Sequence, residues 1–234
     1  MNPSSLPRFV AFGPAHLGAL VLTGAAGAAL ATLVRARPGA GRPVRGLLFA
    51  GISLTLAFVL AVGVREGWLS WQTLLPLHLC DAAMVLALVC LLWPRRGTAE
   101  ILYFWAIAGS GLAMLTPDLP WGFPRWEFAV FFGHHGLVLV TAVVLVFGFG
   151  LRPRRGAPRR AFLATLALAA VAGVVDSLLG LNYMYLRAKP LTPTLLDHMG
   201  PWPVYVGVAA GVAFALFHLL ALPFRREWRA AEGA

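Results

Sequence analysis

Hydrophobic residues gather in seven long runs separated by short polar connections. Each run approaches the roughly 20 residues that an α-helix needs to cross a bilayer. Inside hydrocarbon the backbone must satisfy its own hydrogen bonds, and a long apolar run does so as a helix. The pattern therefore predicts an all-α polytopic membrane protein with seven transmembrane helices, over residues 14–34, 46–64, 74–93, 99–117, 128–151, 161–180 and 202–224.

Lysine and arginine are distributed unevenly over the connections. Fourteen of the 19 basic residues follow the first, third, fifth and last runs, and the other five lie on the opposite side. The positive-inside rule then predicts an N-terminus outside and a cytoplasmic C-terminus. Cleavage of the first run as a signal peptide would leave six spans. The basic cluster follows that run and only Arg8 precedes it, which favours a retained helix.

The composition agrees with a membrane protein. Hydrophobic residues make up 59% of the 234 residues and charged residues only 12%, against about 25% charged in soluble domains. Because no polar stretch is long enough for a separate soluble domain, we expect residues 1–234 to form a single multi-pass domain in the cell membrane. The net charge of +10 lies in short loops, so it indicates contact with anionic headgroups rather than nucleic acid.

Ionisable side chains inside the predicted spans are the main functional signal, because a charge at mid-membrane costs about 2.5–3.5 kcal/mol on insertion scales. At a rise of 1.5 Å per residue, groups from three runs fall at a similar depth, roughly 6–10 Å below the outer edge. They are His78, Cys80, Asp81, His134, His135 and Asp176. His16 and Asn182 lie slightly nearer the surface. The sequence therefore predicts one polar cluster that is shared by several helices.

The segment LPLHLCD at 75–81 concentrates this chemistry. His78 and Asp81 share a helix face at a spacing of three, and Cys80 lies on its flank. Pro76 is tolerated near a helix start, so we expect the helix to begin just before it. A histidine cation and the positive helix end would both favour a nucleophilic thiolate at Cys80. Alternatively, Cys80 is a small buried hydrophobe.

The other members of the cluster also have structural alternatives. The intramembrane histidines would then make interhelical hydrogen bonds, and Asp176 would be a structural partner for His134 or His135. In the longest outer connection, Tyr183, Arg187 and Lys189 would bind a lipid headgroup phosphate together with Asn182. Ordinary interfacial anchoring explains the same residues.

Several motifs occur in the order found in a known family. They are LPLHLCD at 75–81, LYFWAIAGSGLAMLTPDL at 102–119, FFGHHG at 131–136, LGLNYMYLRAKP and LLDHMGPWP. In this set the chain resembles the YwaF-like bacterial integral membrane proteins, from residue 45 to the last span. That family looks related to the eukaryotic transmembrane protein 164 group, which is proposed to contain phospholipid acyltransferases. The resemblance implies Cys80 and His135 as the residues of acyl transfer, and the extra His134 departs from its pattern.

The leading hypothesis is a thiol-dependent lipid acyltransferase or acyl hydrolase whose site faces the outer leaflet. It has membrane phospholipids as substrate and partner and needs no cofactor. Cys80 would attack a lipid ester with His135 as general base, oriented by Asp81 or Asp176. His78 or His134 would donate to the developing oxyanion.

Two other functions stay open. A metal-dependent membrane enzyme would take zinc or iron ligands from His78, Asp81, His134, His135 and Asp176. A transporter or receptor would use the same ionisable groups as a proton relay.

Overall fold

The computed structural model describes residues 7–190 and 194–230, and apart from one isolated β-bridge between Arg8 and Trp121 their regular structure is helical. Six helical segments are long and apolar enough to cross a membrane. Their elements are α1 (Pro14–Ala36), η2 (Pro38–Ala40) with α2 (Gly41–Glu66), α5 (Arg96–Trp105) with η3 (Ala106–Gly111) and α6 (Leu112–Leu115), α7 (Trp126–Val143) with η4 (Val144–Gly148), α8 (Ala157–Leu179), and α9 (Val204–Leu220) with η7 (Leu222–Phe224) and α10 (Arg225–Ala230).

The stretch expected to be a span at 74–93 is broken. It contains the end of α3 (Trp71–Leu74) and the helix α4 (Leu79–Leu92). Leu75 is extended, with φ −80° and ψ 128°, because the residue before a proline avoids the helical region. The 14 residues of α4 measure about 21 Å at 1.5 Å per residue, shorter than a hydrocarbon core of about 30 Å. The expected helix start before Pro76 was wrong by several residues.

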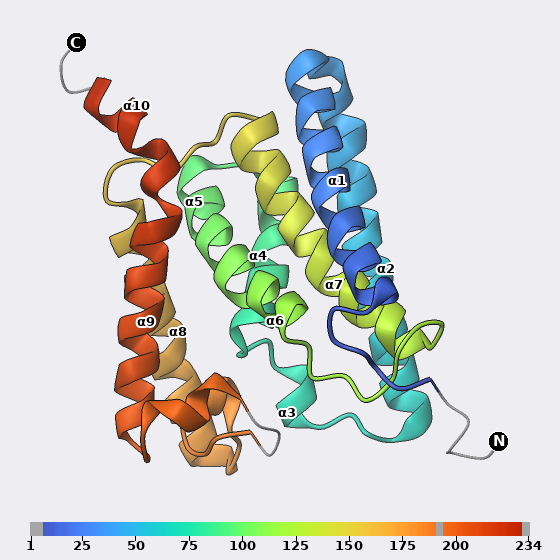
Figure 1. The fold of residues 1–234 in the computed structure, drawn as a ribbon, viewed down its shortest axis with the longest axis vertical. Helices are drawn as coiled ribbons and strands as arrows, with labels where there is room; N and C mark the ends of the chain where they lie inside the picture. The colour runs from blue at the N-terminus through green and yellow to red at the C-terminus, as the bar shows by residue number, and fades with distance from the viewer. Residues whose placement is uncertain (1–6, 191–193, 231–234) are drawn as a thin grey trace.

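Helix α7 lies at the centre of the bundle and packs against α1, α2, α4 and η3. Helix α5 joins this group to α8, and α8 packs against α9 (Figure 1). Trp105 of α5 donates its indole N–H to the Thr165 hydroxyl of α8 at 2.8 Å. Tyr103 donates its hydroxyl to the Leu220 carbonyl of α9 at 3.1 Å. Two polar side chains of α5 thus tie the outer pair of helices to the core.

Small residues set the closest approach of α1 to α7. A Cβ added at Gly136 would lie 2.9 Å from the Thr23 hydroxyl oxygen, and one at Gly27 would lie 3.5 Å from Val143. Such close contact is how helices associate in lipid, where burial of apolar surface gives little driving force. A Cβ added at Gly207 or Gly211 of α9, in contrast, would meet no atom of a neighbouring element within 4 Å among the described residues.

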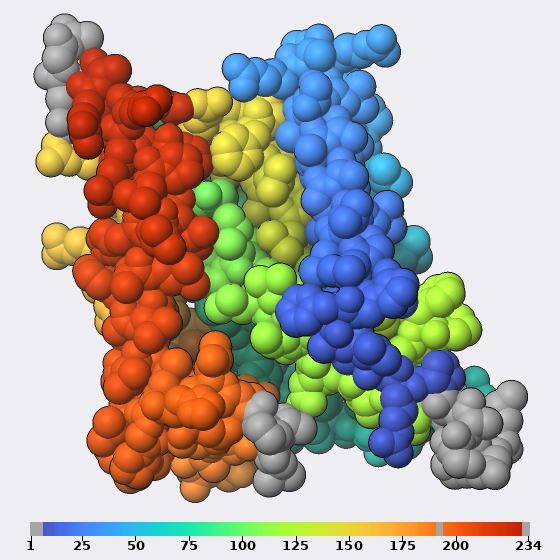
Figure 2. Space-filling model, viewed as in Figure 1, coloured from blue at the N-terminus to red at the C-terminus, as the bar shows by residue number. Residues whose placement is uncertain are grey.

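The connections that carry most of the basic residues lie at one end of the bundle. The α1–α2 connection and α10 lie at the top of Figure 1, and α3 and the segment before α9 lie at the bottom. We call the first end, with residues 37–45, 93–96, 149–156 and α10, the basic end, and the α1–α2 connection and α10 lie along the upper edge of the molecule in Figure 2. The segregation fits a multi-pass membrane protein, in agreement with the six long apolar helices.

Candidate functional site

The chain break before α4 places the polar motif at a helix start. His78 is the N-cap of α4, with φ −72° and ψ 149°, and Asp81 lies in its first turn. The Cys80 thiol donates to the Asp81 carboxylate, with 3.8 Å between Sγ and Oδ1. An acidic side chain at this position is favoured by the positive end of the helix. The thiol therefore has a carboxylate, rather than an imidazole, as its hydrogen-bond partner.

A cavity of about 480 Å³ lies among α2, α3, α4 and α7. Most of its wall is apolar, formed by side chains such as Leu60, Leu69 and Met84. Four ionisable side chains reach it, namely Asp81, Glu127, His134 and His135. We call it the histidine cavity. Its volume falls in the range of small-molecule sites, about 300–1,000 Å³, and a mostly apolar wall with a few polar groups is typical of them.

The two histidines of the cavity differ in their hydrogen bonds. His135 Nδ1 lies 2.8 Å from the Phe131 carbonyl oxygen. A carbonyl only accepts, so Nδ1 carries the proton and Nε2 of the neutral ring keeps a lone pair. His134 Nε2 is buried with no hydrogen-bond partner among the described residues. The ring centroids are 4.9 Å apart, so both imidazoles lie in one small region, and only His135 has a tautomer set by its neighbours.

Glu127 forms a two-pronged ion pair at the edge of the cavity. Arg125 Nε and Nη2 lie 3.0 and 2.5 Å from its two carboxylate oxygens. This pairing compensates its charge and leaves Asp81 as the other carboxylate in the cavity wall.

His78 points away from the cavity wall, toward a loop that follows α8. Its Nε2 lies 3.3 Å from the Gln72 amide nitrogen, and its Nδ1 lies 3.3 Å from the backbone nitrogen of Met184. Both neighbours are donors, and a neutral imidazole accepts through one nitrogen only. One of the two contacts is therefore a hydrogen bond at any time. Asp81 and Asp176 are both near enough to interact electrostatically with the His78 ring.

Asp176 is fully buried near the end of α8. Its Oδ1 accepts the Tyr183 backbone N–H at 2.8 Å, and its Oδ2 has no partner among the described residues. The Asp176 contacts thus run to the following loop, while those of His135 run to Phe131. No hydrogen bond joins Asp176 to His134 or His135 in the part of the chain that the structure describes.

The loop of residues 180–188, here the Tyr183 loop, is held by its own polar groups. Asn182 accepts the N–H groups of Arg187 and Ala188 at 3.0 and 3.2 Å. The Arg187 guanidinium donates to the backbone carbonyl of Asp176 at 2.9 Å. Met184 and Tyr185 adopt the left-handed region, with φ of 52° and 56°, which is costly for residues other than glycine. The Tyr183 loop therefore has a defined conformation that depends on the hydrogen bonds of Asn182 and Arg187.

Tyr183 anchors the same loop to α3. Its side chain is fully buried, and its hydroxyl donates to the Trp71 carbonyl. Burial raises the pKa of this hydroxyl, because a low-dielectric site disfavours the phenolate. The Tyr183 ring lies 5.1 Å from the His78 ring. Tyr183 therefore joins the Tyr183 loop to the start of α4.

Lys189 lies beyond the loop, close to the acidic residue of η6 (Leu195–Met199). Its ammonium lies 4.0 Å from the Asp197 carboxylate and 5.4 Å from the centroid of the Tyr205 ring. Of the four residues expected to bind a headgroup, Asn182 and Arg187 thus shape the loop, Tyr183 is buried and Lys189 has an acidic neighbour.

The structure groups the expected site residues into two adjoining clusters. Asp81, His134 and His135 share the histidine cavity, and Cys80 contacts it through Asp81. His78 and Asp176 belong with the Tyr183 loop, and Asp81 lies between the two clusters. Among the described residues, no group of three or more His, Cys, Asp or Glu side chains is arranged to hold a metal ion.

Sequence reasoning missed two polar residues of this region. Gln72 accepts the Asn182 backbone N–H at 2.9 Å and approaches His78. Glu127 reaches the histidine cavity. Gln72 is the one amide in the otherwise apolar stretch WQTLLPL, which was the available signal. Depth along the helix placed His16 near the cluster. In the structure its Nδ1 accepts the Phe12 backbone N–H at 2.8 Å, and its Nε2 lies 2.7 Å from the Met114 carbonyl oxygen.

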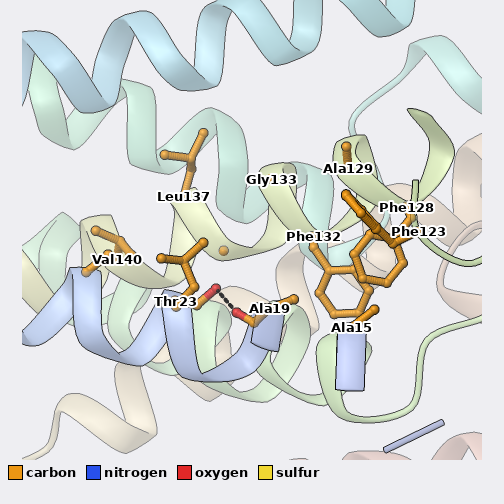
Figure 3. A pocket seen from close by; sticks show the side chains of 13 residues that line it. Ala15, Ala19, Thr23, Phe123, Phe128, Ala129, Phe132, Gly133, Leu137 and Val140 are labelled. Carbon is orange, nitrogen blue, oxygen red and sulfur yellow. Dashed lines mark hydrogen bonds between the residues drawn. The ribbon is translucent and has the colours of Figure 1, made fainter. Parts of the chain in front are cut away.

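A second cavity lies between α1 and α7 and differs in kind. It measures about 510 Å³. In Figure 3 its wall consists of apolar and small side chains, with the Thr23 hydroxyl turned to the Ala19 carbonyl at 2.9 Å. No titratable side chain lines it. Among the described residues it offers volume without reactive groups, whereas four ionisable side chains reach the histidine cavity.

Comparison with known proteins gives one family. The model of the TMEM164 family matches residues 11–221. A protein of Treponema pallidum (strain Nichols), described only as an uncharacterized protein, is 30% identical over 184 residues, which cover 77% of this chain and 76% of that protein. No solved structure matches the chain. The matched segment contains all six long apolar helices, at least in large part, and both polar clusters, and the chain therefore belongs to the TMEM164 family of membrane proteins.

Proposed function

We propose that the protein transfers acyl groups between membrane phospholipids through a Cys80 thioester. The observation that carries the proposal is the histidine cavity, where an apolar wall adjoins Asp81, His134 and His135 and the Cys80 thiol contacts Asp81. The resemblance to proposed phospholipid acyltransferases supports the reaction class. The six long apolar helices support a substrate that lies in the same bilayer.

The apolar wall supports a lipid rather than a soluble substrate. An acyl chain beside Leu60, Leu69 and Met84 would replace contacts with lipid tails by contacts with protein and would leave no polar group unsatisfied. The ester would then lie at the polar side of the cavity, next to Asp81 and the histidines.

In the first step the Cys80 sulfur attacks the ester carbonyl, and the thiol proton passes to the base. The carbon–oxygen bond to the glycerol backbone breaks, and the lysophospholipid leaves with that proton. In the second step a hydroxyl of another lysophospholipid attacks the thioester, and its proton restores the thiol. Water in place of that hydroxyl would release a fatty acid. Both steps conserve charge and need no oxidant or metal.

His135 is the base favoured by its hydrogen bond, since Phe131 holds the proton on Nδ1 and leaves Nε2 free to accept one. Asp81 would position the thiol, which it contacts directly. His134, with Nε2 unpartnered among the described residues, would donate to the oxyanion from its protonated nitrogen. Asp176 and His78 would support the site through the Tyr183 loop.

The test is transfer of a mass-labelled acyl chain from phospholipid to lysophospholipid by purified protein in mixed-lipid nanodiscs, followed by lipid mass spectrometry. Cys80→Ala should lower product to the level of empty nanodiscs. Cys90→Ala is the matched control, since Cys90 lies on the same helix but is fully buried in the core. Wild-type protein without acceptor should gain one acyl mass that hydroxylamine removes. Equal turnover by wild type and Cys80→Ala would refute the thioester.

A further inference from the structure

The basic end of the bundle contains a second kind of site, at the end opposite to α3, which lines the histidine cavity (Figure 1). A pocket of about 310 Å³ is lined by Arg96, Arg152, Pro153, Arg154, Arg155, Glu227 and Trp228. We call it the arginine pocket. Its wall carries four arginines and one glutamate, an excess of three positive charges at neutral pH. The proposed acyl transfer uses none of these residues.

A buried carboxylate holds part of this pocket in place. Glu100 is 1% exposed and accepts from Arg154 Nε at 2.7 Å and from Arg160 Nη2 at 2.7 Å. The backbone N–H of Arg154 also donates to it at 2.9 Å. The hydrogen bond to Glu100 raises the pKa of the Arg154 guanidinium. The loop is therefore fixed before any ligand binds, which reduces the entropy cost of binding.

The opposite wall comes from α10 and is fastened to the same loop. The Trp228 indole N–H donates to the Pro153 carbonyl at 2.8 Å, and Arg152 forms an ion pair with Glu227. Glu227 is about half exposed, so an incoming anion can replace it on Arg152. The side chain of Arg96, at the start of α5, makes no hydrogen bond or ion pair within the described part of the chain. The pocket thus offers one unpaired guanidinium and one whose partner can be displaced.

The position of the pocket indicates the source of the anion. Arg96 begins one candidate span, and η4 ends another at Gly148, four residues before Arg152. The pocket therefore lies where helices leave the hydrocarbon, at the level of lipid headgroups, and a tryptophan is common at that level. A planar guanidinium group can donate two parallel hydrogen bonds to two oxygens of one phosphate group.

From these observations we infer that the arginine pocket binds the phosphate of an anionic phospholipid headgroup, with Arg96 and Arg152 as its ligands and Glu227 as an internal competitor. The site is separate from the histidine cavity, and its occupant need not be the acyl substrate. The inference does not depend on the proposed acyl transfer.

Native mass spectrometry of the detergent-solubilised protein tests it, with phosphatidylglycerol and phosphatidylcholine titrated separately. We expect tighter binding of phosphatidylglycerol. Arg96→Gln should weaken it about fivefold, the effect of roughly one arginine charge near a headgroup. Glu227→Gln should strengthen it by a similar factor, because the competitor is removed. Arg42→Gln, an exposed arginine of the basic end outside the pocket, should change it less than twofold.

The opposite signs of the two pocket variants separate the site from a general loss of folding, which would lower binding in both. Equal binding of the two lipids would overturn the inference, and so would equal losses in Arg96→Gln and Arg42→Gln. A third arm uses glycerol phosphate and inorganic phosphate without lipid. If either one competes phosphatidylglycerol away at equal concentration, the site binds a soluble anion and the assignment to lipid is wrong.

Discussion

The Cys80 thiol donates to the carboxylate of Asp81, the next residue in the chain, across 3.8 Å. Neighbours in a helix rarely face each other, yet here both side chains lie in the first turn of α4, where the helix has just begun. Asp81 also lines the histidine cavity and lies near His78. It is therefore the residue through which the thiol and the imidazoles are connected.

Asp81→Asn should lower acyl transfer at least tenfold while the protein stays folded. The amide keeps the size of the side chain but loses the charge that holds the thiol proton, a change typical of one positioning interaction. Thioester formation without acceptor, followed by intact-protein mass spectrometry, measures the affected step. Glu127→Gln is the matched control, because Glu127 lines the same cavity but pairs with Arg125. A loss confined to Glu127→Gln would contradict the role of Asp81.

Substitutions of the two histidines in the cavity should lower the acyl-transfer rate to different degrees. His135→Gln should reduce the transfer rate by about 100-fold or more, the typical contribution of a general base. His134→Gln should reduce it less, since an amide N–H still donates to the oxyanion. The rates of both variants in the nanodisc assay provide the measurement. Greater damage from His134→Gln would assign the base to the other ring.

Asp176 should matter for stability more than for chemistry. Asp176→Ala leaves the Tyr183 N–H buried without its acceptor, which costs about 1–3 kcal/mol. Asp176→Asn keeps an oxygen for that N–H and should lose less. Thermal unfolding in detergent, followed by tryptophan fluorescence, gives the order wild type, Asn, Ala. Full stability of the Ala variant combined with complete loss of transfer would place Asp176 in the reaction instead.

Removal of the Glu100 carboxylate should destabilise the basic end. Glu100→Gln removes the negative charge and one of the two acceptor oxygens that Arg154 and Arg160 share. Both guanidinium groups are about half exposed and can bind water, so we expect a loss of about 1–3 kcal/mol rather than the larger cost of an orphaned buried charge. Glu227→Gln, at an exposed ion pair, should cost less than about 1 kcal/mol. Chemical unfolding in detergent compares the two variants.

The positions of the long helices followed from hydropathy, but their ends did not. The run expected at 46–64 is a helix over Gly41–Glu66. Hydropathy reports which residues suit hydrocarbon, and the helix continues past them through Arg42, Arg45 and Arg65. Arginine is tolerated near the end of a spanning helix because its long side chain can place the charge away from hydrocarbon. The break before α4 needed the local effect of Pro76 on Leu75, which a hydropathy average over many residues conceals.

The candidate site was predictable in its residue types and less so in its grouping. Depth along each helix placed His78, Cys80, His134 and Asp176 in one layer, but depth contains no information about rotation. Whether a side chain at that depth meets the histidine cavity or the Tyr183 loop depends on which helices pack together. Glu100 escaped notice because its partners, Arg154 and Arg160, lie in another connection.

The pairing of Glu100 with Arg154 also has a consequence for biogenesis. The two residues are 54 positions apart in the chain, and ribosomes add about 5–20 residues per second. The glutamate is therefore synthesised roughly 3–11 s before Arg154. During that interval α5 lacks the two arginines that pair with Glu100 in the folded protein, and only Arg95 and Arg96 precede it nearby in the chain. The native contacts of Glu100 can therefore form only after the connection between α7 and α8 has been synthesised.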